Sequence, residues 1–150
     1  MSHRFWRRLC IGACVALVLG FVVWVGVREE QSPQRRFDVT VAIIASPAQI
    51  IAESPVSWTW DVRAPVGAMA SRSGIRWGAI AHPGEWTAEV TPERSGYPKV
   101  LVEESAAPVA LPMRWTKVGT LPLPGTYSLR AYAVVDGVPY WSPEYGVTVE

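Results

Sequence analysis

An unbroken apolar run near the N-terminus constrains this chain more than any other feature. Nineteen consecutive residues, 9–27, contain no charged and no strongly polar side chain. As an α-helix rising about 1.5 Å per residue, the run would be roughly 28 Å long, close to the ~30 Å hydrocarbon core of a bilayer. Arg4, Arg7 and Arg8 precede it. The sequence therefore predicts a basic tail over residues 1–8 and one transmembrane helix over residues 9–27.

Two other readings of this run are weaker. The apolar core of a cleaved signal peptide spans about 7–15 residues and ends at a small-residue cleavage site. Here the run is longer and ends without an A-x-A pattern, and cleavage near Gly20 would leave residues 21–25, all apolar, exposed at the new end. A lipoprotein reading at Cys14 is discounted because nearly all of the apolar run follows that cysteine. An uncleaved anchor is favoured.

The flanks of the run suggest an orientation. Three arginines lie near each end, but the N-terminal three are tightly clustered, whereas Glu29 and Glu30 dilute the other side. We expect the N-terminus in the cytoplasm and the rest of the chain outside, as in a bacterial inner-membrane protein with a periplasmic domain. Trp6 and Trp24 lie 18 residues apart, about 27 Å along a helix, so each is expected at one membrane interface.

One face of the expected helix carries small residues. Gly12, Ala16 and Gly20 recur every four residues, and such a stripe lets a second membrane helix approach closely. The alternative is that Gly and Ala are simply frequent in membrane helices. Cys10 and Cys14 share a face as well, but they are poorly placed for a disulfide. Palmitoylation or metal binding is conceivable there, and inert thiols are the favoured reading.

The remainder of the chain predicts a polar linker and one domain. Residues 28–36 are polar and contain a proline, and residues 37–150 have the size of an ordinary single domain. The net charge of residues 37–150 is −3, so the basic footprint of a nucleic-acid-binding domain is missing from their sequence. Residues 37–150 also contain no cysteine, so disulfides cannot contribute to the stability of this domain.

Short alternating segments in residues 37–150 predict an all-β fold. In residues 56–62 every second residue is apolar and the others are polar, which places Trp58 and Trp60 on the buried face of a strand. Residues 37–44, 75–81 and 114–118 are further candidate strands, and residues 86–90 and 99–103 are weaker ones. Trp77 lies on the apolar side of its strand. Residues 63–74 are expected to form a long, flexible connection.

The clearest segment is residues 121–149. Pro124-Gly125 predicts a turn, and Tyr127, Leu129 and every second residue to 135 then alternate inward. Asp136-Gly137 is a strong hairpin signal, because both residues tolerate positive φ. Ser142-Pro143 interrupts the return strand, which suits an edge strand with a bulge or kink. About seven short strands on this spacing suggest a sandwich.

Residues 123–132, Leu-Pro-Gly-Thr-Tyr-Ser-Leu-Arg-Ala-Tyr, resemble the penultimate strand of fibronectin type III and related immunoglobulin-like domains. The resemblance implies an immunoglobulin-like sandwich in which Tyr127 packs in the core and its hydroxyl hydrogen-bonds back to the backbone. Trp58 or Trp60 resembles the tryptophan of the family's second strand, and residues 141–143 are similar to a Trp-Ser-Pro that interrupts its last strand. Residues 63–115 depart from the pattern. The resemblance names no ligand.

A search for catalytic chemistry finds little. His3 lies beside the expected membrane helix, and His82 lies in an expected loop before Pro83-Gly84. No CxxC, HExxH, P-loop or GxSxG motif occurs. Acidic pairs such as Glu103-Glu104 point to opposite faces of a strand, and no Asp-rich loop suits calcium. We therefore expect a protein that is not an enzyme and that uses no cofactor or metal.

Aromatic residues are unusually numerous in residues 37–150, with six Trp and five Tyr. A sandwich of this size needs only some of them inside. We expect Trp86, Tyr132, Tyr140 and Trp141 to face outward as a candidate interaction surface, because Trp and Tyr dominate binding hot spots. Trp58, Trp60, Trp77, Tyr127 and Leu129 are the expected structural core. A Trp-rich core with scattered surface rings is the simpler alternative.

Three functions fit these observations. The first is a non-catalytic accessory subunit of a larger membrane complex of respiratory, photosynthetic or transport type, with other membrane subunits and the lipid bilayer as partners. The second is a membrane-tethered module that binds carbohydrate or the cell envelope. The third is an assembly factor or sensor that binds transiently.

Overall fold

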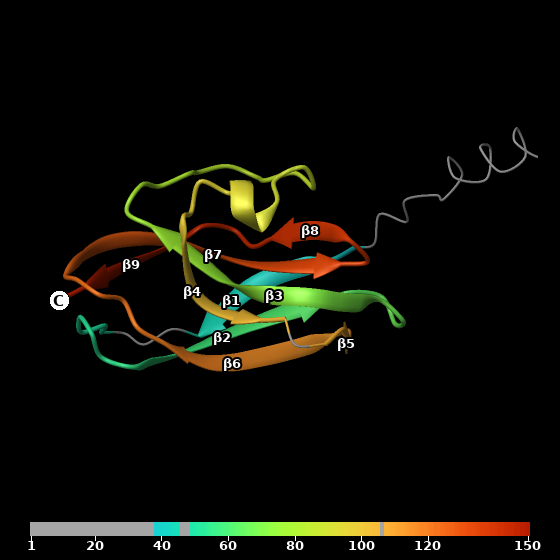
Figure 1. Ribbon diagram of the computed structural model, residues 1–150, viewed down its shortest axis with the longest axis horizontal. Helices are drawn as coiled ribbons and strands as arrows, with labels where there is room; N and C mark the ends of the chain where they lie inside the picture. Colours follow the sequence, from blue (N-terminus) through green and yellow to red (C-terminus); the bar gives the residue numbers. More distant parts are fainter. Residues whose placement is uncertain (1–37, 46–48, 106) are drawn as a thin grey trace, which may run out of the picture. The chain divides into compact units, whose positions relative to one another are not determined.

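The described part of the chain is built from strands, with almost no helix. The structure is a computed structural model that describes residues 38–45, 49–105 and 107–150. Its strands are β1 (Thr40–Ala45), β2 (Val56–Arg63), β3 (Met69–Gly78), β4 (Lys99–Glu104), β5 (Val109–Ala110), β6 (Met113–Gly119), β7 (Gly125–Val135), β8 (Val138–Trp141) and β9 (Tyr145–Val149). One short 3-10 helix, η1 (Pro92–Arg94), lies in the connection from β3 to β4 (Figure 1).

These strands form two antiparallel sheets. The first sheet has the order β1-β2-β6, and the second has the order β4-β3-β7-β8, with β5 beside β3 and β9 beside β7. The two sheets will be called the β1-β2-β6 sheet and the β3-β7 sheet. The all-β prediction is confirmed, and the arrangement is compatible with a β-sandwich.

Buried side chains from both sheets form one hydrophobic cluster. The five residues expected in the core are each at most 8% exposed: Trp58, Trp60, Trp77, Tyr127 and Leu129. Trp60 stacks on its cross-strand neighbour Trp115 with ring centroids 5.9 Å apart. The indole N–H of Trp60 donates to Ser73 Oγ at 2.8 Å, so this polar atom is satisfied inside the core.

The C-terminal hairpin follows its sequence pattern. β7 and β8 are joined by Asp136 and Gly137, with φ of 49° and 83°, as the turn signal predicts. The Tyr127 hydroxyl donates to the carbonyl oxygen of Leu123 at 2.9 Å. The expected interruption is also present, because residues 142–144 separate β8 from β9 while both strands pair with β7.

Two expectations about the middle of the chain are wrong. Residues 63–74 do not form a long flexible connection, because β3 begins at Met69 and only residues 64–68 join it to β2. Residues 86–90 do not form a strand; they belong to the connection that crosses the β3-β7 sheet before β4 begins. The first difference lies in the part of β3 where its pairing with β7 contains a register shift, between Ala70 and Arg72.

The predicted membrane segment falls outside this description. Residues 1–37 are not described, so the expected helix over 9–27 and the residues Trp6, Gly12, Ala16, Gly20 and Trp24 lie outside the described residues. Among residues 38–45, 49–105 and 107–150, no helix is long and apolar enough to cross a membrane.

Candidate functional site

The most elaborate polar and aromatic arrangement lies on the outer face of the β3-β7 sheet. Along β7, the inward positions fill the core, and Arg130 and Tyr132 occupy the opposite face. The connection over residues 79–98 folds back over this side of the sheet (Figure 1). Backbone carbonyls of this connection bond Arg130, and Tyr132 packs against Trp141. We call the group His82, Trp86, Tyr97, Arg130 and Trp141 the loop cluster.

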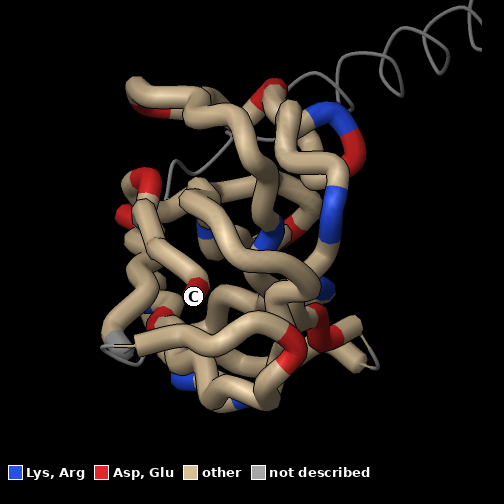
Figure 2. The backbone as a smooth tube through the Cα atoms, turned by 90° about the vertical axis from the view of Figure 1, so that its left-hand side faces the viewer, with Lys and Arg blue, Asp and Glu red and all other residues tan. Residues whose placement is uncertain are grey.

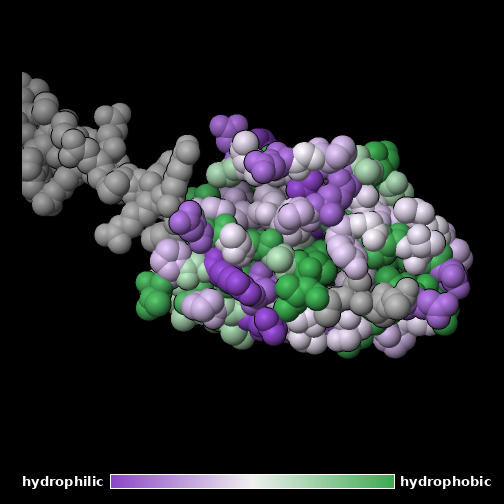
Figure 3. All heavy atoms as spheres, turned by 180° about the vertical axis from the view of Figure 1, so that it is seen from behind, coloured by the Kyte–Doolittle hydropathy of each residue, from purple (hydrophilic) through white to green (hydrophobic). Residues whose placement is uncertain are grey.

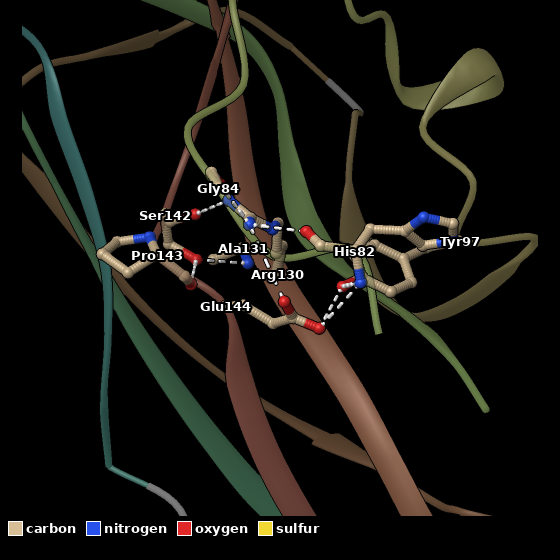
Figure 4. A network of polar contacts seen from close by, with 8 residues as sticks. All are labelled: His82, Gly84, Tyr97, Arg130, Ala131, Ser142, Pro143 and Glu144. Atoms are coloured by element: carbon tan, nitrogen blue, oxygen red, sulfur yellow. Dashed lines mark hydrogen bonds and ion pairs between the residues drawn. The ribbon is translucent and has the colours of Figure 1, made fainter. Parts of the chain in front are cut away.

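Arg130 is the centre of the loop cluster. Its side chain is 2% exposed. Its guanidinium donates from Nη1 to the carbonyl oxygen of Ser142 at 2.9 Å, and from Nη2 to the carbonyl oxygens of His82 at 2.9 Å and Gly84 at 2.6 Å (Figure 4). The guanidinium carbon lies 4.5 Å from the ring centroid of Trp86, a cation–π geometry. Arg130 therefore ties the 79–98 connection to β7 and to the β8–β9 link.

Glu144, in the link between β8 and β9, also binds the 79–98 connection. Its Oε1 accepts the Tyr97 hydroxyl at 2.8 Å and the His82 backbone N–H at 3.0 Å, and its Oε2 lies 3.9 Å from Arg130 Nη2 (Figure 4). Burial acts to raise the pKa of Glu144, but hydrogen bonds from Tyr97, Ser128 and the His82 backbone outweigh it and lower the pKa. Burial, and then the bond to Glu144, raises the pKa of Tyr97.

The aromatic rings of the loop cluster pack on one another. Trp86 meets Trp141 edge-on at 4.7 Å between centroids and lies 5.2 Å from Tyr97. The indole N–H of Trp141 donates to the carbonyl oxygen of Val90 at 2.8 Å. Tyr132 lies 5.3 Å from Trp141 and hydrogen-bonds Glu103 through its hydroxyl. Each ring thus has a packing partner within the domain.

Of the four aromatic residues expected to face outward, the structure brings three together. Trp86 and Trp141 are half-buried neighbours in the loop cluster. Tyr132 was expected on the surface, but it is 0% exposed, because the 79–98 connection and Trp141 cover the outer face of β7. Tyr140 lies apart from them, partly buried against the hydrophobic core. These residues do not form the open aromatic surface that the sequence suggested.

Sequence reasoning missed Arg130, Glu144 and Tyr97. A sequence signal was present at one of them: Arg130 is the only charged residue in the segment 125–135, whose alternation predicts a strand. An arginine there must find partners, because a buried charge without them is costly. His82 was expected to be a solvated loop residue. It is half-buried, and its backbone groups bond Arg130 and Glu144.

Arg72 and Arg130 on the outer face each lie beside a carboxylate, of Glu93 and Glu144. Arg72 Nη2 lies 2.5 Å from Glu93 Oε1 in η1. Arg76 is the cross-strand partner of Arg130, and its Nη1 donates to the carbonyl oxygen of Tyr97 at 3.5 Å. Basic and acidic positions are interspersed along the domain (Figure 2). This distribution does not resemble a nucleic-acid-binding face.

Among residues 38–45, 49–105 and 107–150, no three His, Cys, Asp or Glu side chains lie close enough together to hold a metal ion. On the β1-β2-β6 sheet, a shallow hollow of about 290 Å³ is lined by Thr40, Ala42, Ile44, Asp61 and Arg63. Seen from behind, the domain shows hydrophobic and hydrophilic residues side by side (Figure 3).

Comparisons with known proteins add no assignment. No known protein family matches this chain, and no curated protein is significantly similar to it.

Proposed function

We propose that this chain is a non-catalytic, single-pass membrane accessory subunit, whose helix and extracytoplasmic domain bind other subunits of a larger membrane complex. The observation that carries the proposal is that the loop cluster around Arg130 binds the chain's own backbone. The three hydrogen bonds of Arg130 end on backbone carbonyls of its own chain. Arg130 thus holds the chain's own 79–98 connection and β8–β9 link in place, a structural use of the guanidinium that suits a binding domain.

The proposal includes an immunoglobulin-like domain of the fibronectin type III kind over residues 37–150. The strand order β1-β2-β6 opposite β4-β3-β7-β8 supports it. So does the Tyr127 hydroxyl bonded to Leu123, which has the form of a tyrosine corner. This architecture hosts many functions, so the likeness supports the scaffold and does not identify the partner.

The membrane part of the proposal rests on sequence. The apolar run 9–27 is long enough to span a bilayer, and the stripe Gly12, Ala16 and Gly20 would let a partner helix approach closely. We place the N-terminus in the cytoplasm and residues 37–150 in the periplasm or outside.

Two alternative functions remain to be compared. An assembly factor or sensor would bind its partners for a shorter time than a permanent subunit does. The carbohydrate-binding alternative gains no support, because a stacking platform needs open ring faces and Trp86 and Trp141 pack on each other.

Purification in mild detergent through a C-terminal tag tests this proposal. We expect the chain to co-purify with partner subunits in fixed stoichiometry. Gly12→Leu together with Gly20→Leu should release those partners, because the larger side chains hold the partner helix away. Val18→Leu, on the opposite face of the expected helix, is the matched control and should keep them. A monomeric unchanged chain would contradict the proposal.

A further inference from the structure

One edge of the β1-β2-β6 sheet lacks the features that keep edge strands from pairing with other chains. β1 has the sequence Thr-Val-Ala-Ile-Ile-Ala, without a charge or a proline. It pairs with β2 on one side, and no strand in the described part of the chain pairs with its other side (Figure 1). Such an edge presents backbone N–H and carbonyl groups to an extended strand that approaches it.

The other edges formed by described strands carry protective features. β6, at the opposite edge of the same sheet, contains Arg114 and Lys117. β4 contains a lysine and two glutamates. β8 contains Pro139, and residues 142–144 separate it from β9. Charges, prolines and short strands all discourage pairing with another chain. β1 therefore differs from these edges in a sequence that permits such pairing.

The side chains of β1 are apolar on both faces of the sheet. Val41 is buried, and Ile43 packs against the hydrophobic core. On the outer face, Ile44 is 43% exposed and lines the shallow hollow of this sheet together with Thr40 and Ala42. A strand that is apolar on both faces is typical of strands covered on both faces. The outer face of β1 thus has the composition of a contact surface.

A second copy of β1 is complementary to this surface. If two copies pair antiparallel about Ala42, then Ile44 of each copy lies opposite Thr40 of the other, on the same face of the sheet. The exposed Ile44 side chain of each copy then lies at the rim of the hollow of the other copy. No like charges meet within the paired segment, because residues 40–45 carry none. The contact is the same from both sides, so it closes as a dimer.

The side chains also select the register of this pairing. A shift by one residue is excluded, because it would place outer-face residues opposite inner-face residues. The next register that keeps the faces matched is centred on Val41, and it sets Ile44 against the exposed Asp38. That register places an apolar side chain beside a carboxylate. The register centred on Ala42 sets Ile44 against Thr40 and is favoured.

We propose that two copies of this domain pair antiparallel through β1, so that their β1-β2-β6 sheets join into one continuous sheet. Ile44 of each copy covers the β1 side of the hollow of the other. Asp61 and Arg63, whose side chains lie 3.0 Å apart, form the β2 side of the hollow and already satisfy each other. The inference rests on the described domain and does not require the accessory-subunit role.

Cysteine cross-linking on the full chain tests the pairing and its direction. The native cysteines are replaced, as Cys10→Ala and Cys14→Ala, and a copy with Thr40→Cys is co-expressed with a differently tagged copy with Ile44→Cys. Opposite residues have Cβ atoms about 5 Å apart, whereas the same position in the two copies is about 13 Å apart, four residues along the strand. Mild oxidation should give the mixed disulfide in at least about tenfold excess over either like pair. Equal yields of the three products overturn the pairing.

A charge on β1 tests the same contact without cysteines. Ala42→Lys sets two lysines opposite each other at the centre of the pair, and it should raise the dissociation constant of the dimer at least about tenfold. Val118→Lys is the matched control, because Val118 is 66% exposed on β6 at the opposite edge of the sheet. It should change the constant less than about twofold. Analytical ultracentrifugation in mild detergent measures both variants, and near-ultraviolet circular dichroism checks that they fold.

The remaining outcomes separate this dimer from other contacts. A monomeric unchanged chain, or equal dissociation constants in the two lysine variants, overturns the β1 dimer and leaves the accessory-subunit role standing. Loss of the mixed disulfide in Gly12→Leu with Gly20→Leu would assign the contact to the N-terminal segment and also overturn it. A different protein bound to β1 would appear as a complex that Ala42→Lys dissolves and that yields no mixed disulfide, which contradicts pairing between copies.

Discussion

Arg130 occupies a position on β7 where the chain could have kept an exposed polar residue, yet it is 2% exposed. Its cost of desolvation is offset by three carbonyl acceptors and the Trp86 ring. The position therefore depends on the planar, multi-donor shape of the guanidinium. An apolar side chain of similar length could fill the space but could not bond the connection over residues 79–98.

Arg130→Met should lower the free energy of unfolding by about 3 kcal/mol, because it leaves the acceptors of His82, Gly84 and Ser142 without their donor. Thermal unfolding followed by near-ultraviolet circular dichroism measures the loss. Arg63→Met is the control: its side chain is 73% exposed in a surface ion pair, so a change below about 1 kcal/mol is expected. Equal losses in the two variants would show that Arg130 does not clamp the connection.

Acid should loosen the contact made by Glu144. The hydrogen bonds from Tyr97, Ser128 and the His82 backbone prevail over burial and hold the pKa of Glu144 below its ordinary 4.5. The stabilisation is therefore fully present above about pH 4.5 and is lost as pH falls through the lower folded-state pKa. The melting temperature of Glu144→Gln should be lower at neutral pH and should fall less between pH 5 and pH 3.

Some acid dependence should remain in Glu144→Gln. The hydrogen bond to Arg72 lowers the pKa of Glu93 as well, so Glu93 contributes in the same pH window. Replacing the exposed Glu89 by glutamine is the control. The melting temperature of this variant should change with pH as it does in the unchanged chain. An identical acid response in Glu144→Gln and the unchanged chain would mean that the Glu144 contacts do not stabilise the fold.

At the scale of elements, β3 and β4 approach each other closely at one glycine. A Cβ on Gly74 would overlap the carbonyl oxygen of Val102 and lie 3.0 Å from Glu103 Cα. Gly74→Ala should therefore push β4 away and cost about 2 kcal/mol. Gly146→Ala in β9 meets no atom within 4 Å and should be neutral or slightly stabilising. Urea unfolding of both variants compares them, and equal effects would contradict a tight β3–β4 contact.

The sequence located best the elements with a regular two-residue period, and it found β3 only in its second half, from residue 75. β2 and the inward positions of β7 alternate strictly, and both were located correctly. In β3 the buried residues Ala70, Ser73, Ile75 and Trp77 do not alternate, because the register shifts between Ala70 and Arg72. Ser73 is polar as well as buried. Its hydroxyl partners, Trp60 and the Tyr132 carbonyl, come from distant parts of the chain.

The same limit applies to the candidate surface. Alternation along β7 correctly placed Tyr132 on the face opposite Leu129 and Ala131. Whether that face meets water depends on the connection over residues 79–98, which has no regular period. Its position is decided by Arg130 and Glu144, through contacts 46 to 62 residues apart in sequence. Local patterns carry no information about contacts of that range.

On the scale of the whole molecule, residues 37–150 form one compact unit. All members of the main hydrophobic cluster lie between Val41 and Val149. A chain that lacks residues 1–36 should therefore fold by itself, with a melting temperature within a few degrees of that of the full chain. Calorimetry and near-ultraviolet circular dichroism check this. An expanded state without near-ultraviolet signal would show that the N-terminal residues are needed for folding.

The interruption at residues 142–144 also affects how copies of this domain behave at high concentration. A long, straight edge strand is a template on which other chains add strands and grow into fibrils. Here β8 and β9 are four and five residues long, and the Ser142 hydroxyl is engaged by the Ala131 N–H and the Pro143 carbonyl. The break divides this edge into two short strands, on which another chain adds a strand poorly, so it disfavours aggregation through this edge.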